Sequence, residues 1–193
     1  MAGNDLTEFS PQQIVSCDVG NGDMGCQGGY PSTAMDYVKT AGGMATEADY
    51  PYTSTTGVTG DCTSPLPKLS GGTVSTWEYA TDPCKPGEDA CVEDSAALAS
   101  AIKSHGGISI VVDASTFNSY QGGILTADSC SSDPARLDHA IQVVGWNVPR
   151  VGKPYWIVRN SWAAGWGEDG FIRMEMGTNT CGLANQPVII TEV

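Results

Sequence analysis

Basic residues are scarce in this sequence. Lys and Arg together number nine against 22 Asp and Glu, which gives a formal net charge of −13 and a pI near 4.2. Proteins that bind nucleic acid neutralise phosphates with clustered Lys and Arg, so the charge balance argues against nucleic acid as a partner. Long apolar runs are also missing: no stretch approaches the roughly 20 apolar residues that a membrane span needs, and we expect no membrane partner. The 193 residues, 40% of them hydrophobic, predict a water-soluble globular protein.

Metal-binding patterns are lacking as well. The chain has only two His, and none of its seven Cys forms a C-x-x-C pair, so we expect no metal and no other cofactor. Seven Cys favour a disulfide framework instead, and with it an oxidising compartment, either secreted or lysosomal/vacuolar. No secretory signal is visible after Met1, and we expect that it has been removed or lies outside this piece. A G-x-S-x-G nucleophile elbow is missing too, so we interpret Ser161 as structural.

The chain is most informative between Leu137 and Met174, LDHAIQVVGWNVPRVGKPYWIVRNSWAAGWGEDGFIRM. His139 precedes an apolar strand, and a second apolar strand leads to Asn160. This pattern predicts an imidazole and an amide at the ends of two strands. The amide oxygen can then accept from one ring nitrogen and leave the other to take a proton from a nucleophile. On spacing alone, a purely structural His139 is the commoner alternative.

The residue pattern of this stretch resembles that of a known family. D-H-A before a hydrophobic strand and G-W, followed by Y-W-I-V-R-N-S-W-x-x-x-W-G-x-x-G-F-I-R, is similar to the His and Asn regions of papain-like cysteine peptidases. The C-x-G-G-Y motif at Cys26 adds to the likeness. The resemblance implies that His139 and Asn160 are catalytic and that Trp162 shields their hydrogen bond from water.

The resemblance also implies the fold class, α+β of the papain-like kind. A helical domain over residues 1–73 would face a β-barrel-like domain over 74–187 across the active-site cleft, and a strand at 188–193 would return to the first domain. The match begins just past the family's long helix with the catalytic Cys. We therefore expect this chain to lack that central helix, the Cys and the oxyanion-hole Gln. Without that helix, apolar faces that it would cover are exposed, and we expect the helical domain to be marginally stable.

The cysteines divide into pairs and one remainder. The resemblance implies the bridges Cys17–Cys62 and Cys130–Cys181. Cys84 and Cys91 lie in an insertion, D-P-C-K-P-G-E-D-A-C, that the family pattern lacks, and the Pro-Gly turn between them indicates a small local loop. Cys26 is left as a free or intermolecular thiol, because its family partner belongs to the missing segment. We do not expect it to replace the nucleophile.

The substrate contacts are likewise implied by the resemblance. Gly28 and Gly29 would let an extended substrate backbone pair with the protein, although the simpler interpretation of this glycine-rich loop is a turn held by a disulfide. A largely apolar specificity pocket would be lined by Tyr30, Pro31, Val111, Leu137 and Ala140, with Gln186 near its floor. Asp138 is expected as a further substrate-binding residue.

Three functions remain open. The preferred one is a cysteine endopeptidase present here without its nucleophile, so that the chain alone is inactive; the missing segment would be removed, lost, or supplied as a separate peptide linked through Cys26. The second is a non-catalytic homologue that binds peptides or inhibitors. The third is an interaction protein that dimerises. The expected partners are accordingly a peptide or protein substrate, an N-terminal peptide, or a second copy of the chain.

Local signals predict the main elements. Ser10 and Pro11 start a short helix, and Pro31 starts another that ends at Gly42. Residues 53–72 have no periodicity and predict a surface excursion. The other predicted elements are a helix at 93–104 and strands at 73–79, 107–114, 170–176 and 187–193.

Overall fold

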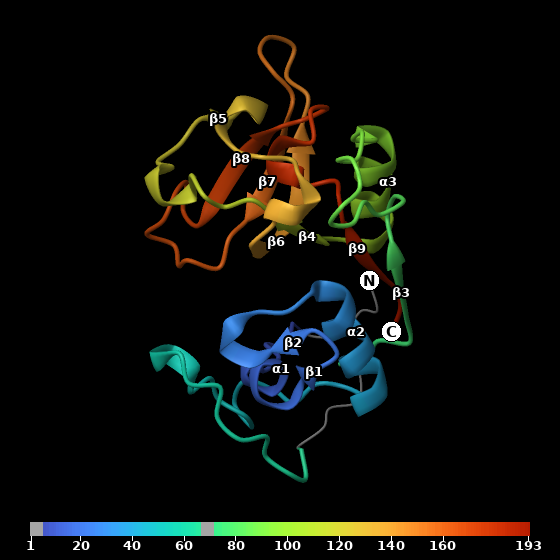
Figure 1. Ribbon diagram of the computed structural model, residues 1–193, viewed down its shortest axis with the longest axis vertical. Coiled ribbons are helices and arrows are strands. Elements are labelled where there is room, and N and C mark those ends of the chain that lie inside the picture. Colours follow the sequence, from blue (N-terminus) through green and yellow to red (C-terminus); the bar gives the residue numbers. More distant parts are fainter. Residues whose placement is uncertain (1–5, 67–71) are drawn as a thin grey trace. The chain divides into compact units, whose positions relative to one another are not determined.

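The computed structural model describes residues 6–66 and 72–193 and is shown in Figure 1. The chain separates into two compact units, unit 1 (Met1–Trp77 with Ile190–Val193) and unit 2 (Glu78–Ile189). Their assignment to the two domains of a papain-like fold, with a division at 73/74, stays a prediction.

Part of the predicted surface excursion at 53–72 falls outside the described residues, as do residues 1–5. Its described portion contains a single 3₁₀ turn, Ser54–Thr56, and is joined to the first helix by the Cys17–Cys62 bridge.

The two helices of unit 1 begin where their caps predict. α1 (Pro11–Cys17) starts after Ser10, whose side chain accepts the backbone N–H of Gln13. α2 (Pro31–Ala41) ends at Gly42, which has a φ of 75° that suits glycine. Both starts and the second end are therefore confirmed.

A short hairpin connects these helices. β1 (Val19–Gly20) pairs with β2 (Asp23–Met24) in an antiparallel manner. The two residues between them, Asn21 and Gly22, have φ values of 51° and 102°. An Asn-Gly pair with two positive φ angles is the preferred two-residue hairpin turn.

The interior of unit 1 is polar rather than apolar. Gln12 and Gln13 are 1% and 0% exposed, whereas Ile14 and Val15, the apolar pair of α1, are only half-buried. On α2, Val38 is buried, whereas Ala34 and Met35 are half-buried. In the described part of unit 1, the buried apolar side chains are Val38, Ala45 and Val74.

Unit 2 contains the strands β4 to β8 of a mixed sheet whose strand order is β3-β9-β4-β6-β7-β8-β5. The central strands β4, β6, β7 and β8 are antiparallel neighbours, and β5 joins β8 in parallel (Figure 1). The strand bounds are β3 (Thr76–Tyr79), β4 (Ile108–Val112), β5 (Ile124–Leu125), β6 (His139–Asn147), β7 (Tyr155–Arg159), β8 (Phe171–Glu175) and β9 (Val188–Glu192).

The hydrophobic core lies in unit 2. Trp156 and Met174 are fully buried on neighbouring strands, and the helix α3 (Ser95–His105) packs Leu98 and Ile102 into the same cluster. The helix begins two residues later than predicted, because the Asp94 side chain caps it by accepting the Ala97 N–H. Short 3₁₀ turns occur at Gly25–Gln27, Phe117–Ser119, Ala127–Ser129, Pro134–Arg136 and Thr180–Gly182.

Three disulfides are formed, Cys17–Cys62, Cys84–Cys91 and Cys130–Cys181, and Cys26 is free and exposed. No helix within residues 6–66 and 72–193 is long and apolar enough to cross a bilayer. Over the same described ranges, no group of three or more His, Cys, Asp or Glu could hold a metal ion.

Candidate active site

His139 and Asn160 lie at the same end of two neighbouring strands. β6 begins at His139, and β7, which ends at Arg159, runs antiparallel to it with Arg159 opposite Gln142. Asn160 continues the course of β7 toward the start of β6. The antiparallel pairing therefore brings the imidazole and the amide together.

The contact between them shows which ring nitrogen of His139 carries a proton. Nε2 of His139 lies 2.8 Å from Oδ1 of Asn160, and the same oxygen accepts the backbone N–H of Ser161 at 2.7 Å. An atom that accepts from a backbone N–H is the carbonyl oxygen of the amide, so the donor to it must be Nε2–H. The neutral imidazole then keeps its lone pair on Nδ1. Asn160 is 8% exposed and His139 is half-buried.

Aromatic side chains surround this hydrogen bond. The Trp162 indole lies against the imidazole, with ring centroids 5.1 Å apart and planes at 36°, and Phe117 meets the same ring edge-on at 6.4 Å. Trp166 packs against both Trp162 and Phe117, and its Nε1–H donates to the Phe117 carbonyl. Shielding of the imidazole–amide bond from water by Trp162 stays a prediction. Trp166 belongs to the quoted motif, whereas Phe117 comes from a different part of the chain, so its contact with His139 is not a local signal.

An ion pair supports the loop that carries these indoles. The guanidinium of Arg173 donates to both carboxylate oxygens of Glu168 at 2.5 and 2.8 Å, and Gly123 N–H donates to the same carboxylate. The hydrogen bond from Arg173 lowers the pKa of Glu168 more than burial raises it. Tyr120 adds a link, because its hydroxyl donates to Gly123 O and accepts from Arg173 N–H.

Several of the implied pocket residues lie around the start of β6. Val111 is opposite Ala140 in the β4–β6 register. The Asp138 carboxylate accepts the Ala114 N–H, and its own N–H donates to Val112 O. Leu137 is half-buried and approaches Gly182 closely enough that a Cβ there would collide with it. Gln186 is half-buried between the buried Asn185 and Pro187.

The other implied substrate residues are in unit 1. Gly28 has a φ of 109°, which favours glycine, and both Gly28 and Gly29 are exposed. A Cβ on Gly29 would collide with the Asp23 carboxylate, which accepts the Tyr30 N–H at 2.8 Å. Pro31 occupies the first turn of α2. Peptide binding by these residues stays a prediction.

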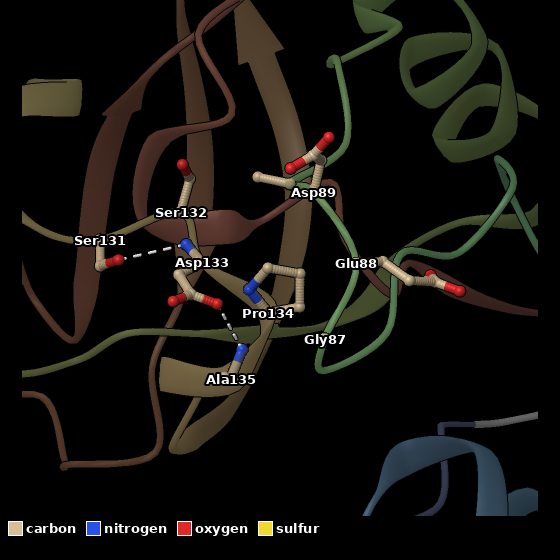
Figure 2. A pocket seen from close by; sticks show the side chains of 9 residues that line it. Gly87, Glu88, Asp89, Ser131, Ser132, Asp133, Pro134 and Ala135 are labelled. Carbon is tan, nitrogen blue, oxygen red and sulfur yellow. Dashed lines mark hydrogen bonds between the residues drawn. The ribbon is translucent and has the colours of Figure 1, made fainter.

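Two further features are the exposed thiol of Cys26 and a cavity in unit 2. Cys26 N–H donates to Thr59 Oγ1, and the thiol itself is unbonded. Figure 2 shows a cavity of about 550 Å³ in unit 2, between the Cys84–Cys91 loop and the segment before Leu137. It contains none of the predicted site residues. Its lining residues are Gly87, Glu88, Asp89, Ala90, Ser131, Ser132, Asp133, Pro134 and Ala135.

In chemical terms, an imidazole oriented by a buried amide and covered by an indole is a base ready to accept a proton from a nucleophile. These features describe the class of nucleophilic hydrolases. The profile of the papain family cysteine proteases matches residues 1–191, so the chain belongs to this family.

Individual relatives agree with this assignment. The chain is 41% identical to a cysteine proteinase of Trypanosoma brucei brucei over 190 residues, which are 97% of this chain and 38% of that protein. It is 36% identical to cysteine proteinase 2 of Zea mays over 177 residues, 91% of this chain and 45% of the relative. The chain thus spans less than half the length of these curated relatives.

Solved structures show the papain-like α+β fold. Digestive procathepsin L 3 of Tenebrio molitor matches with a TM-score of 0.77 and 29% identity, covering 95% of this chain and 55% of that one. The bromelain protease of Ananas comosus, solved in complex with the E64 inhibitor, also gives 0.77, with 28% identity over 97% of this chain and 80% of that one. The disulfides and the family together indicate a compartment of the secretory pathway.

Proposed function

We propose that this chain supplies the base and the orienting amide of a cysteine endopeptidase that hydrolyses peptide bonds by a Cys-His-Asn mechanism. The observation that carries the proposal is the 2.8 Å contact from His139 Nε2 to Asn160 Oδ1, covered by Trp162. No Cys precedes Cys17 in the printed sequence. The nucleophile and the oxyanion-hole Gln would therefore come from a preceding segment, including the central helix of the helical domain, in the same chain or as a peptide joined through Cys26.

In the proposed reaction, His139 Nδ1 takes the proton of the incoming thiol, and the thiolate attacks the carbonyl carbon of the scissile bond. The imidazolium returns this proton to the leaving amine as the C–N bond breaks. A water molecule then attacks the thioester and gives a proton to the same nitrogen. The C–S bond breaks, the acid product departs, and the thiolate takes the proton back, which restores the free enzyme. Asn160 keeps the ring in one tautomer throughout.

The test joins the chain to the segment that precedes the matched region in the Trypanosoma brucei proteinase. The fused protein should hydrolyse a fluorogenic peptide, a thiol alkylator should abolish the activity, and His139→Ala should lower kcat by about 10²–10⁴-fold. The chain without the added segment should have no turnover. A folded fusion with an intact Cys and no hydrolysis would overturn the proposal.

Substrate class follows from the implied pocket. Val111, Ala140 and Leu137 supply apolar surface and Gln186 a polar group, so bulky apolar substrate side chains are favoured. Such a pocket separates substrates that differ by one methylene by only about 1–3 kcal/mol, and the specificity is therefore broad. We place the protein outside the cell or in a lysosome or vacuole.

A second candidate is a non-catalytic homologue that binds peptides or inhibitors. Saturable binding of a peptide library to the chain alone, combined with an inactive fusion, would favour it over the peptidase. A concentration-dependent dimer that disappears in Cys26→Ser would instead support the interaction protein.

A further inference from the structure

Two carboxyl groups meet at the base of the β1–β2 hairpin. Asp23 is opposite Gly20 in the register, and Asp18 is two residues before Gly20, so both side chains belong to the same face of the ribbon. The Asp18 carboxyl is within hydrogen-bonding reach of Asp23. The hairpin thus places two acids together just before the Gly28–Tyr30 segment.

Neither carboxyl is fully satisfied when both are ionised. Asp23 is 7% exposed; its Oδ1 accepts the Tyr30 N–H, but its Oδ2 is buried without a hydrogen-bond partner. Oδ2 of Asp18 is also buried without one. Two ionised carboxylates can only accept, so the pair needs something between them.

Among the residues that the structure describes, the neighbours of Asp18 do not supply a counter-ion. Asp18 faces Asp23 from β2 and Asp36 and Tyr37 from α2, all of which are acidic or neutral. Asp18 and Asp36 also line a cavity of about 350 Å³ whose lining contains no Lys, Arg or His. A proton is therefore the smallest group that satisfies both oxygens.

We propose that Asp18 and Asp23 share one proton, and that this proton holds the hairpin and the adjoining Gly28–Tyr30 segment in place. When the proton is lost to solvent, two negative charges remain together and the segment loosens. Asp23 transmits the change directly, because its other oxygen holds the Tyr30 N–H and its carboxylate leaves no room for a side chain at position 29.

The electrostatics of Asp18 give the direction in which pH changes the order of the segment. Burial, followed by the hydrogen bond to Asp23 and the charges of Asp23 and Asp36, raises the pKa of Asp18 to about 7. The segment is therefore ordered in acid and loosens as the pH rises through neutrality. Control of peptide binding by this switch rests on the proposed function, whereas the switch itself does not.

The experiment titrates the carboxyl carbons of the whole chain by ¹³C NMR and follows hydrogen exchange at the Tyr30 amide. A titration step near pH 7 is expected at the Asp18 carboxyl carbon. Protection at Tyr30, corrected for intrinsic exchange, should fall about tenfold between pH 5.5 and 8.5. Neither readout requires activity, so failure of the switch is distinguishable from failure of the peptidase proposal.

Variants sharpen the test. Asp18→Asn replaces the shared proton with an amide N–H and should make Tyr30 protection independent of pH over this range. Asp36→Asn removes a neighbouring charge and should lower the midpoint without abolishing the step, while the exposed Asp61→Asn should not change it. The proposal is overturned if the Asp18 carboxyl carbon does not titrate near neutrality, or if Asp18→Asn keeps the wild-type pH dependence. It is also overturned if Ca²⁺ restores protection at pH 8.5, since the pair would then be a cation site. The wild-type titration decides the matter if the first variant does not fold.

Discussion

At the scale of single residues, the hydrogen bond between His139 and Asn160 gives the site its chemical direction. The buried Asn160 Oδ1 accepts two N–H groups, whereas its Nδ2 is buried with no partner among the described residues. An Asp in this position would place a second acceptor and a charge beside the indole of Trp162. The amide instead orients the ring without adding a charge beside it.

This orientation is directly observable. We expect the Nε2–H of His139 to give a ¹⁵N–¹H signal that exchanges slowly with water, because the proton is held at an acceptor 2.8 Å away under an indole. Asn160→Ala should abolish the signal, and Trp162→Ala should speed its exchange. His105, the other histidine and an exposed one, serves as the internal control and should show no such signal. Equal exchange at the two rings would contradict the assignment.

A second residue-scale prediction concerns Asp113, which is 2% exposed at the end of β4. Its oxygens accept the backbone N–H groups of Ser115 and Ser131. Burial alone would raise the pKa of Asp113, but these hydrogen bonds, with the Ser115 side chain and the charge of Arg136, outweigh it and lower the pKa.

A lowered folded pKa means that the stabilisation is present above the unfolded value near 3.9 and is lost as the pH falls through the folded value. Asp113→Asn should therefore lower the free energy of unfolding by about 1–3 kcal/mol at pH 7, and by less at pH 3. Denaturant unfolding at the two pH values measures this. The exposed Asp89→Asn is the control, and a cost that is equal at both pH values would refute the explanation.

At the scale of elements, the carboxylate of Glu93 joins three segments of unit 2. Its Oε1 accepts from Trp156 Nε1 on β7 and from the Gly177 N–H, and its Oε2 accepts the Asn179 N–H. The Ser95 hydroxyl at the start of α3 donates to the same carboxylate. The residue follows the Cys84–Cys91 loop, so it ties the insertion to the sheet.

We expect Glu93→Ala to lower the free energy of unfolding by about 2–4 kcal/mol, because it leaves these donors, including the fully buried Trp156 indole, without an acceptor. Glu93→Gln, which keeps one acceptor oxygen, should cost less. Glu88→Ala in the neighbouring exposed loop is the control. Thermal unfolding of the three variants measures the order, and a loss for Glu88→Ala as large as that for Glu93→Ala would exclude this role.

These elements also show which features the sequence can predict. Ser10-Pro11 and Pro31 marked helix starts correctly, because capping depends on residues within one turn. The burial of the polar side chains Gln12 and Gln13 on α1 was not predictable from such local signals. Gln12 is buried because its amide reaches Ser54 and Thr59, whose positions depend on the Cys17–Cys62 loop rather than on any local pattern.

The same distinction between local signals and contacts of distant segments applies to the candidate site. His139 and Asn160 could be singled out because each lies next to a recognisable apolar strand within one motif. The contact of Phe117 with His139 and that of Glu93 with Trp156 could not be predicted, because they form only when the sheet brings distant segments together. Periodicity reports which face is buried, whereas it does not report which polar group a buried donor meets.

At the scale of the whole molecule, the two units differ in what holds them together. Unit 2 contains the large cluster around Trp156, Val158, Ile172 and Met174, all fully buried. The described part of unit 1 relies on hydrogen bonds of Gln12 and Gln13 and on one disulfide, with few buried apolar side chains. Since apolar burial contributes about 25 cal/mol per Å², unit 1 should be the less stable of the two.

Hydrogen exchange at pH 5.5, where the Asp18–Asp23 pair would hold its proton, tests this difference. Amides of α1 and α2 should open with a free energy several kcal/mol below that of β6, β7 and β8. Adding the upstream segment of the Trypanosoma brucei proteinase should raise protection in α1 and α2 and leave the sheet unchanged, because the half-buried Ile14, Val15 and Met35 would gain apolar partners. The exposed Cys84–Cys91 loop is the internal control, since it should exchange at the same rate in both proteins. Equal protection of the two units in the chain alone would mean that the hydrogen-bonded interior of unit 1 is as stabilising as the apolar core of unit 2. No upstream helix would then be needed to complete it.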